Sequence, residues 1–269
     1  MGVEPNGAAV HPRGMKAVCA RSLTAIGLAV SLAGWSMGAV AKPADLPEKP
    51  VMYSYQSILT MPRGQWAEMD KAYAARRVVL DRAIAEGRLI AYGNDSNLFH
   101  TADGWTHVDW WEGTSLASVF KVLDEMKKAG ATDSPILATA LKQVDGAYVS
   151  RYYNWRPGAY EGLFTHVGIY KLKADAPAGA TETLSKEAIM PVLEPLVASG
   201  AIVQYEIDEE AFSPGSGAFF ISFMAQTPEQ MMETNAALTA MFKSHPAGSM
   251  VDLSVYRDAY SRTEKVVYH

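Results

Sequence analysis

Two series of apolar patterns follow each other along the chain after residue 50. In each series, short strand-like runs alternate with longer segments in which apolar side chains recur at helical spacing. The patterns of the first series predict a strand at 52–61, a helix at 64–86, strands at 89–99 and 105–111, a helix at 115–128 and a last strand that includes 148–155. The second series predicts a strand at 163–172, a helix at 181–199, strands at 202–212 and 218–224, a helix at 228–243 and a last strand that includes 252–259.

Signals for helix ends support this division. Gly87 and Gly200 follow the first helix of each series, where glycine commonly ends a helix. Thr227-Pro228 is typical of a helix start, with threonine as the cap and proline at the first helical position.

The two series are copies of one another. The segment LDRAIAEGRLIAYGND (Leu80–Asp95) aligns with LEPLVASGAIVQYEID (Leu193–Asp208) at an offset of 113 residues. The same offset pairs Val108 with Ile221, and we expect it to hold through the next strand of each copy. An internal repeat of this length indicates two related structural units.

The order of elements, βαββαβ, occurs twice and defines the ferredoxin-like unit, whose antiparallel sheet has helices on one face only. Two such units can cover their bare faces by packing sheet to sheet. In this arrangement the chain resembles the tandem form of the dimeric α+β barrel superfamily. The resemblance implies an α+β fold with repeats at 50–157 and 160–262 that pack as a barrel. Two side-by-side domains with separate partners are the alternative.

The first 41 residues have the pattern of a secretory signal. Lys16 and Arg21 precede the apolar run LTAIGLAVSL, and Ala39-Val40-Ala41 is a typical cleavage site. The run is short for a membrane span. We therefore expect cleavage after Ala41 and a periplasmic or secreted bacterial location, with an uncleaved membrane anchor as the alternative.

Charge and cysteine content exclude several classes of protein. Residues 42–269 contain 21 basic and 28 acidic side chains, a net charge of −7, and therefore lack the basic character of a nucleic-acid-binding protein. Cys19 is the only cysteine and lies in the predicted signal, so we expect neither a disulfide nor a thiol nucleophile in the remainder. No membrane span is expected after cleavage.

The candidate catalytic residues lie in the segment THVDWWE (106–112). As a strand, it places His107, Asp109 and Trp111 on one face. At an offset of 113, the matching residues of the second copy are Phe220, Ser222 and Met224, so the His-Asp pair occurs only in the first copy. This asymmetry suggests a site.

Three interpretations of the pair are open. His107 could act as a general acid or base, with Asp109 orienting its imidazole. His107 and Asp109 could bind a divalent metal together with His166. The pair could also be a hydrogen-bonded structural group. We favour the first over the metal site, for which H-x-D is a weak signal.

Further ligand-binding candidates alternate on other strands. Gly168, between two of them, lacks a side chain and could leave room for a ligand. Together with Trp111, the candidates are Tyr53, Tyr55, Arg151, His166 and Tyr170.

Some members of the resembled superfamily bind haem through a histidine near the end of the second helix. The segment ALTAMFKSHPAG places His245 at such a position, and His245 is therefore an alternative haem ligand. We expect no cofactor otherwise. The motifs G-x-S-x-G, Walker A, G-x-G-x-x-G, H-E-x-x-H and the EF-hand loop are all absent from the sequence.

Taken together, the sequence predicts an exported barrel that binds a small apolar or aromatic molecule; a homo-oligomer is compatible with the sequence, which does not determine the oligomeric state. The resemblance implies a cofactor-free oxygenase or isomerase. The alternatives are haem binding and a non-enzymatic role in which exposed aromatic side chains bind another exported protein. The candidates for such an interface are Trp110, Tyr152, Tyr153 and Trp155.

Overall fold

A computed structural model describes residues 49–99, 104–212 and 217–269. The fold below is that of the described residues of the unit Asp45–His269. The predicted signal segment, 1–41, lies outside the described residues. Among the described residues, no helix combines the length and apolar character needed to cross a membrane.

The predicted order of elements is present twice. The first copy contains β1 (Met52–Thr60), α1 (Trp66–Ala85), β2 (Ala91–Asn97), β3 (His107–Gly113), α2 (Leu116–Lys128) and β4 (Lys142–Trp155). The second contains β6 (Leu163–Lys171), α3 (Ala180–Leu184), α4 (Met190–Ser199), β7 (Ile202–Glu210), β8 (Ala218–Ala225), α5 (Pro228–Ser244) and β9 (Arg257–Tyr268). A short strand, β5 (Gly158–Tyr160), links the copies, and a π turn at Ser185–Ile189 joins α3 to α4.

Local chemistry explains the helix ends. The side chains of Ser115 and Thr227 accept hydrogen bonds from backbone N–H groups in the first turns of α2 and α5. Gly87 and Gly200 have φ of 69° and 79°, a left-handed conformation that glycine adopts without strain. The last strand differs from the prediction, because a 3₁₀ turn occupies Leu253–Val255 and β9 begins only at Arg257.

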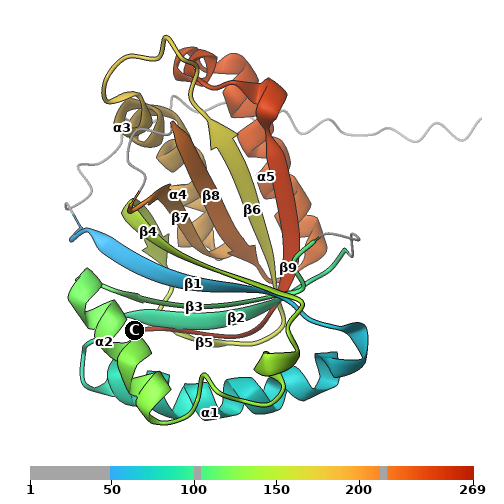
Figure 1. Cartoon of the computed structure of the whole chain (residues 1–269). Coiled ribbons are helices and arrows are strands. Elements are labelled where there is room, and N and C mark those ends of the chain that lie inside the picture. The colour runs from blue at the N-terminus through green and yellow to red at the C-terminus, as the bar shows by residue number, and fades with distance from the viewer. Residues whose placement is uncertain (1–48, 100–103, 213–216) are drawn as a thin grey trace, which may run out of the picture. The chain divides into compact units, whose positions relative to one another are not determined.

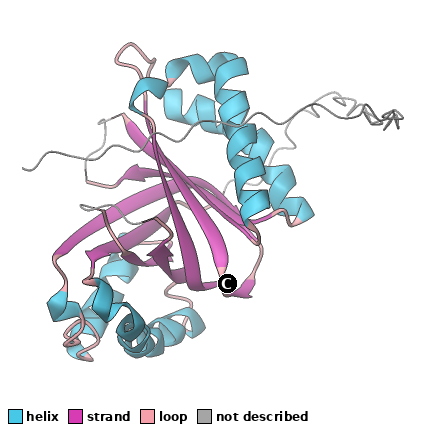
Figure 2. Cartoon of the chain, turned by 90° about the vertical axis from the view of Figure 1, so that its right-hand side faces the viewer, coloured by secondary structure: helices cyan, strands magenta, loops and turns pink. Residues whose placement is uncertain are grey.

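The strands form a closed antiparallel barrel. Each copy has the ferredoxin-like strand order, β2-β3-β1-β4 and β7-β8-β6-β9. The two sheets join where β4 pairs with β7 and where β2 pairs with β9. The short strand β5 pairs with the last residues of β9. Helices α1 and α2 cover one sheet, and α4 and α5 cover the other (Figures 1 and 2). The predicted eight-stranded α+β barrel is therefore confirmed.

Strand pairing corrects the alignment of the two copies. In β2 and β7 the offset is 113, and Tyr92 and Tyr205 both bond an acid on the preceding helix, Asp81 and Glu194. However, Tyr92 pairs with Trp111 whereas Tyr205 pairs with Phe223, so the offset in β3 and β8 is 112.

Side chains on a strand alternate between its two faces. An alignment that is wrong by one residue therefore matches the residues on one face of β3 with those on the opposite face of β8. The true counterparts of His107, Asp109 and Trp111 are Phe219, Ile221 and Phe223, and not the residues expected from the sequence. The His-Asp pair still has no polar counterpart in the second copy, but its matches are the buried core residues Phe219 and Ile221.

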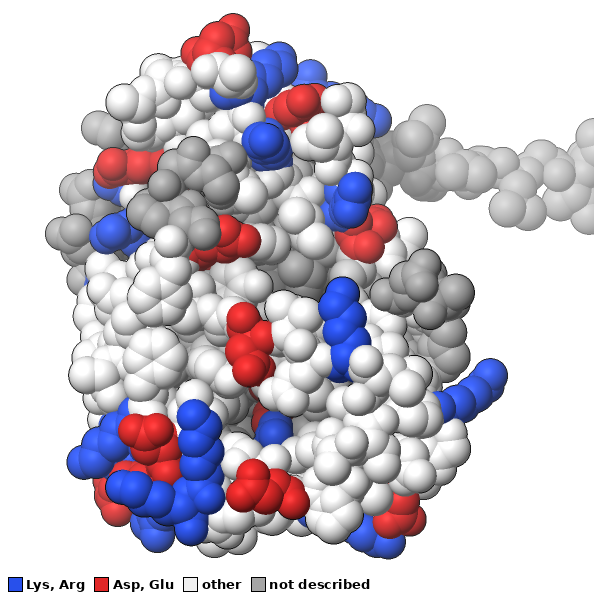
Figure 3. Space-filling view, viewed as in Figure 1, with Lys and Arg blue, Asp and Glu red and all other residues white. Residues whose placement is uncertain are grey.

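The two faces of each sheet have different surroundings. The outer faces pack on the helices in two large apolar cores, one under α1 and α2 and one under α4 and α5. The inner faces enclose the barrel interior, which contains a separate apolar cluster that includes Trp110, Val266 and Tyr268. On the surface in Figure 3, the described acidic and basic side chains are interspersed, which agrees with the absence of a basic footprint in the sequence.

Candidate functional site in the barrel interior

The barrel interior contains a cavity of about 160 Å³. A cavity of this size accommodates a single six-membered ring. The interior face of β3 contributes Val108, Trp110 and Glu112 to the cavity lining. The predicted residues His107, Asp109 and Trp111 lie on the opposite face of this strand. The other lining residues are Gln56, Ile58, Asp95, Trp105, Tyr148, Thr165, Val167, Ile169, Gln204, Glu206, Asp208, Phe220, Ser222, Met224, Ala259 and Ser261.

Three carboxyl groups lie together in this cavity. Glu112 comes from β3, and Glu206 and Asp208 are alternate residues of β7. Each is at most 5% exposed. Glu206 accepts a hydrogen bond from Gln204 Nε2 at 2.6 Å and lies close enough to Glu112 to raise its pKa, and Asp208 accepts a hydrogen bond from Ser150 Oγ. The lining residues include no Lys, Arg or His side chain.

Burial and mutual repulsion determine the protonation of this cluster. Burial raises the pKa of Glu112 well above its usual value, and the neighbouring Glu206 and Asp208 raise it further. Burial likewise raises the pKa of Glu206 and, more strongly, that of Asp208, which Glu206 raises further. Burial and mutual repulsion therefore favour the protonated forms of these carboxyl groups.

Two buried oxygen atoms at this site lack a donor. Gln204 Oε1 has no hydrogen-bond partner, and Gln204 is 1% exposed. Glu112 Oε2 also has no hydrogen-bond partner. An unpaired buried acceptor costs about 1–3 kcal/mol, so the site favours a bound molecule that donates hydrogen bonds.

A fourth carboxyl, Asp95 of β2, is saturated by comparison. It accepts hydrogen bonds from Trp110 Nε1 at 2.9 Å, Thr165 Oγ1 at 3.0 Å and Thr263 Oγ1 at 2.6 Å. Asp95 is the counterpart of Asp208 in the repeat, and each lies where the two sheets join. We therefore assign Asp95 a structural role.

The interior is asymmetric around these two aspartates. Next to Asp208 lie Glu206 and, across the barrel, Glu112. Their counterparts next to Asp95 are Gly93 and Met224. The indole of Trp110 fills the space over Gly93, since a Cβ there would lie 2.5 Å from its Cζ2 atom. The functional asymmetry of the repeat is thus real, but it lies on the inner face.

The two ends of the barrel interior carry different side chains. Where β4 and β9 end, the rings of Tyr153, Trp155 and Tyr268 stack in sequence, with centroids 5.0 and 5.4 Å apart. Lys49 lies over Tyr153 and Trp155 at this end. The lining residues nearest the opposite end are partly exposed, namely Ile58, Trp105, Ile169 and Ala259.

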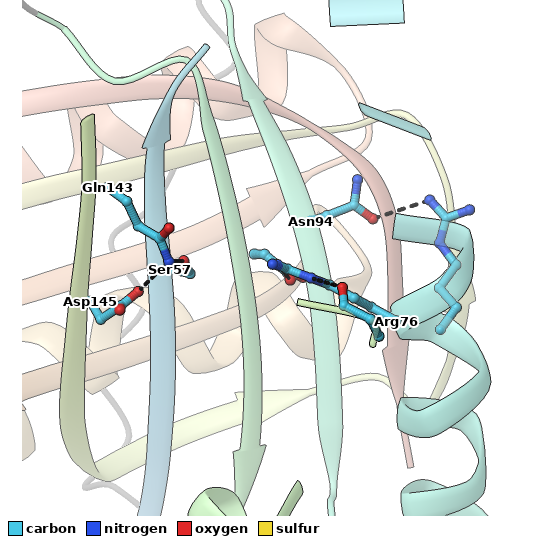
Figure 4. Close-up of polar contacts among 8 residues, drawn as sticks. Ser57, Arg76, Asn94, Gln143 and Asp145 are labelled. Atoms are coloured by element: carbon cyan, nitrogen blue, oxygen red, sulfur yellow. Dashed lines mark hydrogen bonds and ion pairs between the residues drawn. The ribbon is translucent and has the colours of Figure 1, made fainter. Parts of the chain in front are cut away.

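The predicted catalytic pair lies outside this cavity, on the helix-facing side of β3. Asp109 forms a buried ion pair with Arg76 of α1, which also bonds the carbonyl of Ala131 (Figure 4). His107 Nδ1 lies 2.9 Å from Thr106 Oγ1, and its ring packs against Trp66. The predicted orientation of His107 by Asp109 is therefore replaced by an Asp109–Arg76 pair.

The neighbouring candidates also face the helices. Tyr55 stacks on Trp111 at 4.4 Å in the core under α1 and α2, and Tyr53 packs against the same core. Figure 4 shows this outer side of the sheet, where Gln143 of β4 bonds Ser57 of β1. These residues lie close together, but none of the predicted ones lines the cavity.

The candidates of the second copy form a different cluster, under α5. His166 packs between Phe223 and Tyr260, at 4.9 and 5.0 Å, and its Nε2 lies 3.3 Å from Tyr256 Oη. The ring of Tyr170 occupies the space over Gly168, where a Cβ would lie 2.5 Å from its Cε2 atom. The room expected at Gly168 is therefore already filled.

The remaining predicted residues are also accounted for. Arg151 is exposed beside the outer face of β7. Trp110 and Tyr153 are 6% and 5% exposed, and with Trp155 they pack inside the barrel. Tyr152 packs against the core under α4 and α5. The expected exposed aromatic interface is thus largely internal.

The residues around His245 do not form an open haem site. His245 Nδ1 accepts a hydrogen bond from the N–H of Ala247 and so caps a 3₁₀ turn, Pro246–Met250. Tyr170 and Phe242 fill the space between α5 and the sheet, with centroids 4.8 Å apart. A haem would have to displace this core, and we derive no chemistry through it.

Metal binding finds no support in the geometry. His107 and His166, the two histidines of the metal alternative, pack in the separate helix-facing cores of the two copies. Within the described ranges, no three His, Cys, Asp or Glu side chains are arranged to hold a metal ion.

A sequence signal for the interior site exists in β7. The segment VQYEIDE alternates apolar Val203, Tyr205 and Ile207 with polar Gln204, Glu206 and Asp208. Such alternation predicts one apolar and one polar face. None of these polar residues is among the site residues predicted from the sequence.

Comparison with known proteins supports the fold. No family model matches the chain, and no curated protein matches it by sequence. A "putative monooxygenase" from Lactobacillus acidophilus has a similar structure, with a TM-score of 0.60, 8% identity, and coverage of 82% of this chain and 97% of the other. A second "putative monooxygenase", from Fusobacterium nucleatum subsp. nucleatum, has a TM-score of 0.58 at 6% identity and covers 81% and 94%.

A mutant chlorite dismutase from Candidatus Nitrospira defluvii is also similar, with a TM-score of 0.51, 10% identity, and coverage of 79% and 90%. These proteins are α+β barrels of the dimeric α+β barrel superfamily. The chain has the fold of this superfamily, as its sequence predicted. At these identities the likeness concerns the fold alone.

Proposed function

We propose that the protein binds a small organic molecule in the barrel interior and transfers protons to and from it through Glu112 and Glu206. The observation that carries this proposal is the ring-sized cavity lined by two buried, neighbouring carboxyl groups and by no basic residue. A purely structural interior would gain stability from apolar side chains at these positions, because burying carboxyl groups is costly.

The geometry suggests an acid–base mechanism. The ionised member of the pair, held by Gln204, takes a proton from a carbon next to an electron-withdrawing group of the ligand, and the electron pair stays on the ligand. The carboxyl group that took the proton then returns it at another atom of the ligand, which completes an isomerisation without any further reactant. Reaction of the same carbanion with dioxygen would instead make the protein a cofactor-free oxygenase.

Hydrogen exchange tests this function without knowledge of the natural substrate. Single-ring ketones such as cyclohexanone are incubated with the protein in D₂O, and loss of the α-hydrogen signal is followed by NMR. We expect exchange faster than in buffer, abolished in Glu206→Gln and retained in Glu209→Gln, a matched control on the opposite face of β7. Exchange no faster than in buffer, or unchanged in Glu206→Gln, would overturn the proton-transfer role.

Export, homo-oligomerisation and haem binding remain proposals that rest on the sequence. Export is tested by the N-terminus of the protein isolated from its own host, where Lys42 is expected first. Homo-oligomerisation is tested by native mass spectrometry, which would also detect a bound molecule. The haem alternative is tested by absorption spectra of wild type and His245→Ala. The absence of a Soret band in both proteins would overturn it.

A further inference from the structure

The chemistry of the cavity lining also restricts the charge of the molecule that it binds. Four carboxyl groups line the cavity, and no lining residue is a Lys, Arg or His. Only Asp95 is saturated by hydrogen bonds within the protein. An anionic ligand would meet buried negative charge or would require every carboxyl to be protonated.

Two unpaired oxygen atoms of the lining can accept hydrogen bonds from a ligand. Gln204 Oε1 is an acceptor, Glu112 Oε2 is an acceptor when its carboxyl group is ionised, and both residues are at most 2% exposed. A ligand with several N–H donors can satisfy both at once and still approach Glu206. An ammonium group has three donors and a positive charge, whereas a hydroxyl group has one donor and no charge.

The rest of the lining suits a ring. The aromatic residues Trp105, Trp110, Tyr148 and Phe220 line the cavity together with aliphatic side chains. Aromatic faces attract a cation as well as an apolar ring. The volume of about 160 Å³ limits the ligand to about one ring with a short substituent.

Resting on the proposed function, we infer that the natural ligand is a single-ring organic amine, bound as its cation, whose ammonium group is held by Glu112 and Gln204. The carboxyl protons and the ammonium group cannot neutralise the same oxygen atoms. Binding of the ammonium group therefore releases the carboxyl protons of the ligand-free protein. The titratable groups that face this position are Glu112 on β3, Glu206 and Asp208 on β7 and Asp95 on β2. The tyrosines facing it are Tyr148 and Tyr153 on β4 and Tyr268 on β9.

Three probes of equal size and different charge test this inference. Isothermal titration at pH 7.5 compares benzylamine, benzyl alcohol and benzoate. We expect benzylamine to bind at least tenfold more tightly than benzyl alcohol, and benzoate to show no binding. Repetition in two buffers of different ionisation enthalpy is expected to reveal proton release with benzylamine. Glu112→Gln should weaken benzylamine at least tenfold, while Glu209→Gln should leave its affinity unchanged.

The outcomes separate this inference from the proposed function. Equal or tighter binding of benzyl alcohol or benzoate would overturn the inferred ligand charge, and ketone exchange would still decide the proton-transfer role. Benzylamine binding without ketone exchange in wild type would retain the amine site and overturn the catalytic role. Absence of binding by all three probes would overturn the inference.

Discussion

The burial of His166 predicts how the free energy of unfolding depends on pH, and the magnitude of this effect can be calculated. Burial lowers the pKa of His166 from 6.5 to about 4, against a small opposing effect of Asp258. Above pH 6.5 the imidazole is neutral in both the folded and the unfolded chain. As the pH falls below 6.5 the unfolded chain gains a proton that the folded protein does not, so stability is lost.

The loss has a calculable limit. A difference of about 2.5 pH units corresponds to about 3.4 kcal/mol, of which about 2.5 kcal/mol is reached by pH 4.5. His166→Phe keeps a ring against Phe223 and Tyr260 and removes the titration. We therefore expect the stability of this variant relative to wild type to rise by about 2.5 kcal/mol between pH 7 and pH 4.5.

Urea unfolding followed by tryptophan fluorescence at several pH values provides the assay. The comparison must be between variants, because protonation of the interior carboxyls changes the absolute stability of both proteins in the opposite direction. Replacement of the exposed His269 by Gln serves as the control and should show no such trend. A stability difference between His166→Phe and wild type that is independent of pH would refute the assigned burial of His166.

Three further substitutions probe the buried charges. Glu112→Gln should be more stable relative to wild type at pH 8 than at pH 5, because burial raises the pKa of Glu112 while the unfolded chain ionises it; an equal difference at both pH values, measured by urea unfolding, would contradict this. Trp110→Phe removes a donor to buried Asp95 and should lower the free energy of unfolding by about 1.5–3 kcal/mol, whereas an unchanged midpoint in thermal unfolding would argue against the bond. Arg76→Met leaves the carboxylate of Asp109 buried without a partner and should cost about 3–5 kcal/mol in denaturant unfolding, most of which should return in the double variant Arg76→Met/Asp109→Leu.

The sequence predicted local structure well because local structure depends on near neighbours. The caps at Ser115 and Thr227 and the glycines at helix ends act within a few residues, and the order βαββαβ followed from them. The predicted helices and strands agree with the structure to within a few residues, apart from the start of β9. The repeat then indicated two sheets with bare faces, from which the barrel could be inferred.

The interior carboxyl groups were not among the predicted site residues, because the orientation of a strand face is not a local property. Both faces of β3 carry polar and aromatic side chains, Asp109 and Trp111 on one and Trp110 and Glu112 on the other. The partner of Asp109 on α1 lies 33 residues away, and the neighbour of Glu112 on β7 comes from the other copy. No pattern within the strand records which partner each face will meet.

What the chain encodes locally is therefore the sequence of elements, their ends and the duplication. The closure of the barrel decided the rest. Pairing of β2 with β9 and of β4 with β7 set the register and turned Glu112, Glu206 and Asp208 toward one another. Their raised pKa values arise from burial and mutual repulsion across that interior, which exist only when strands distant in the sequence are brought together.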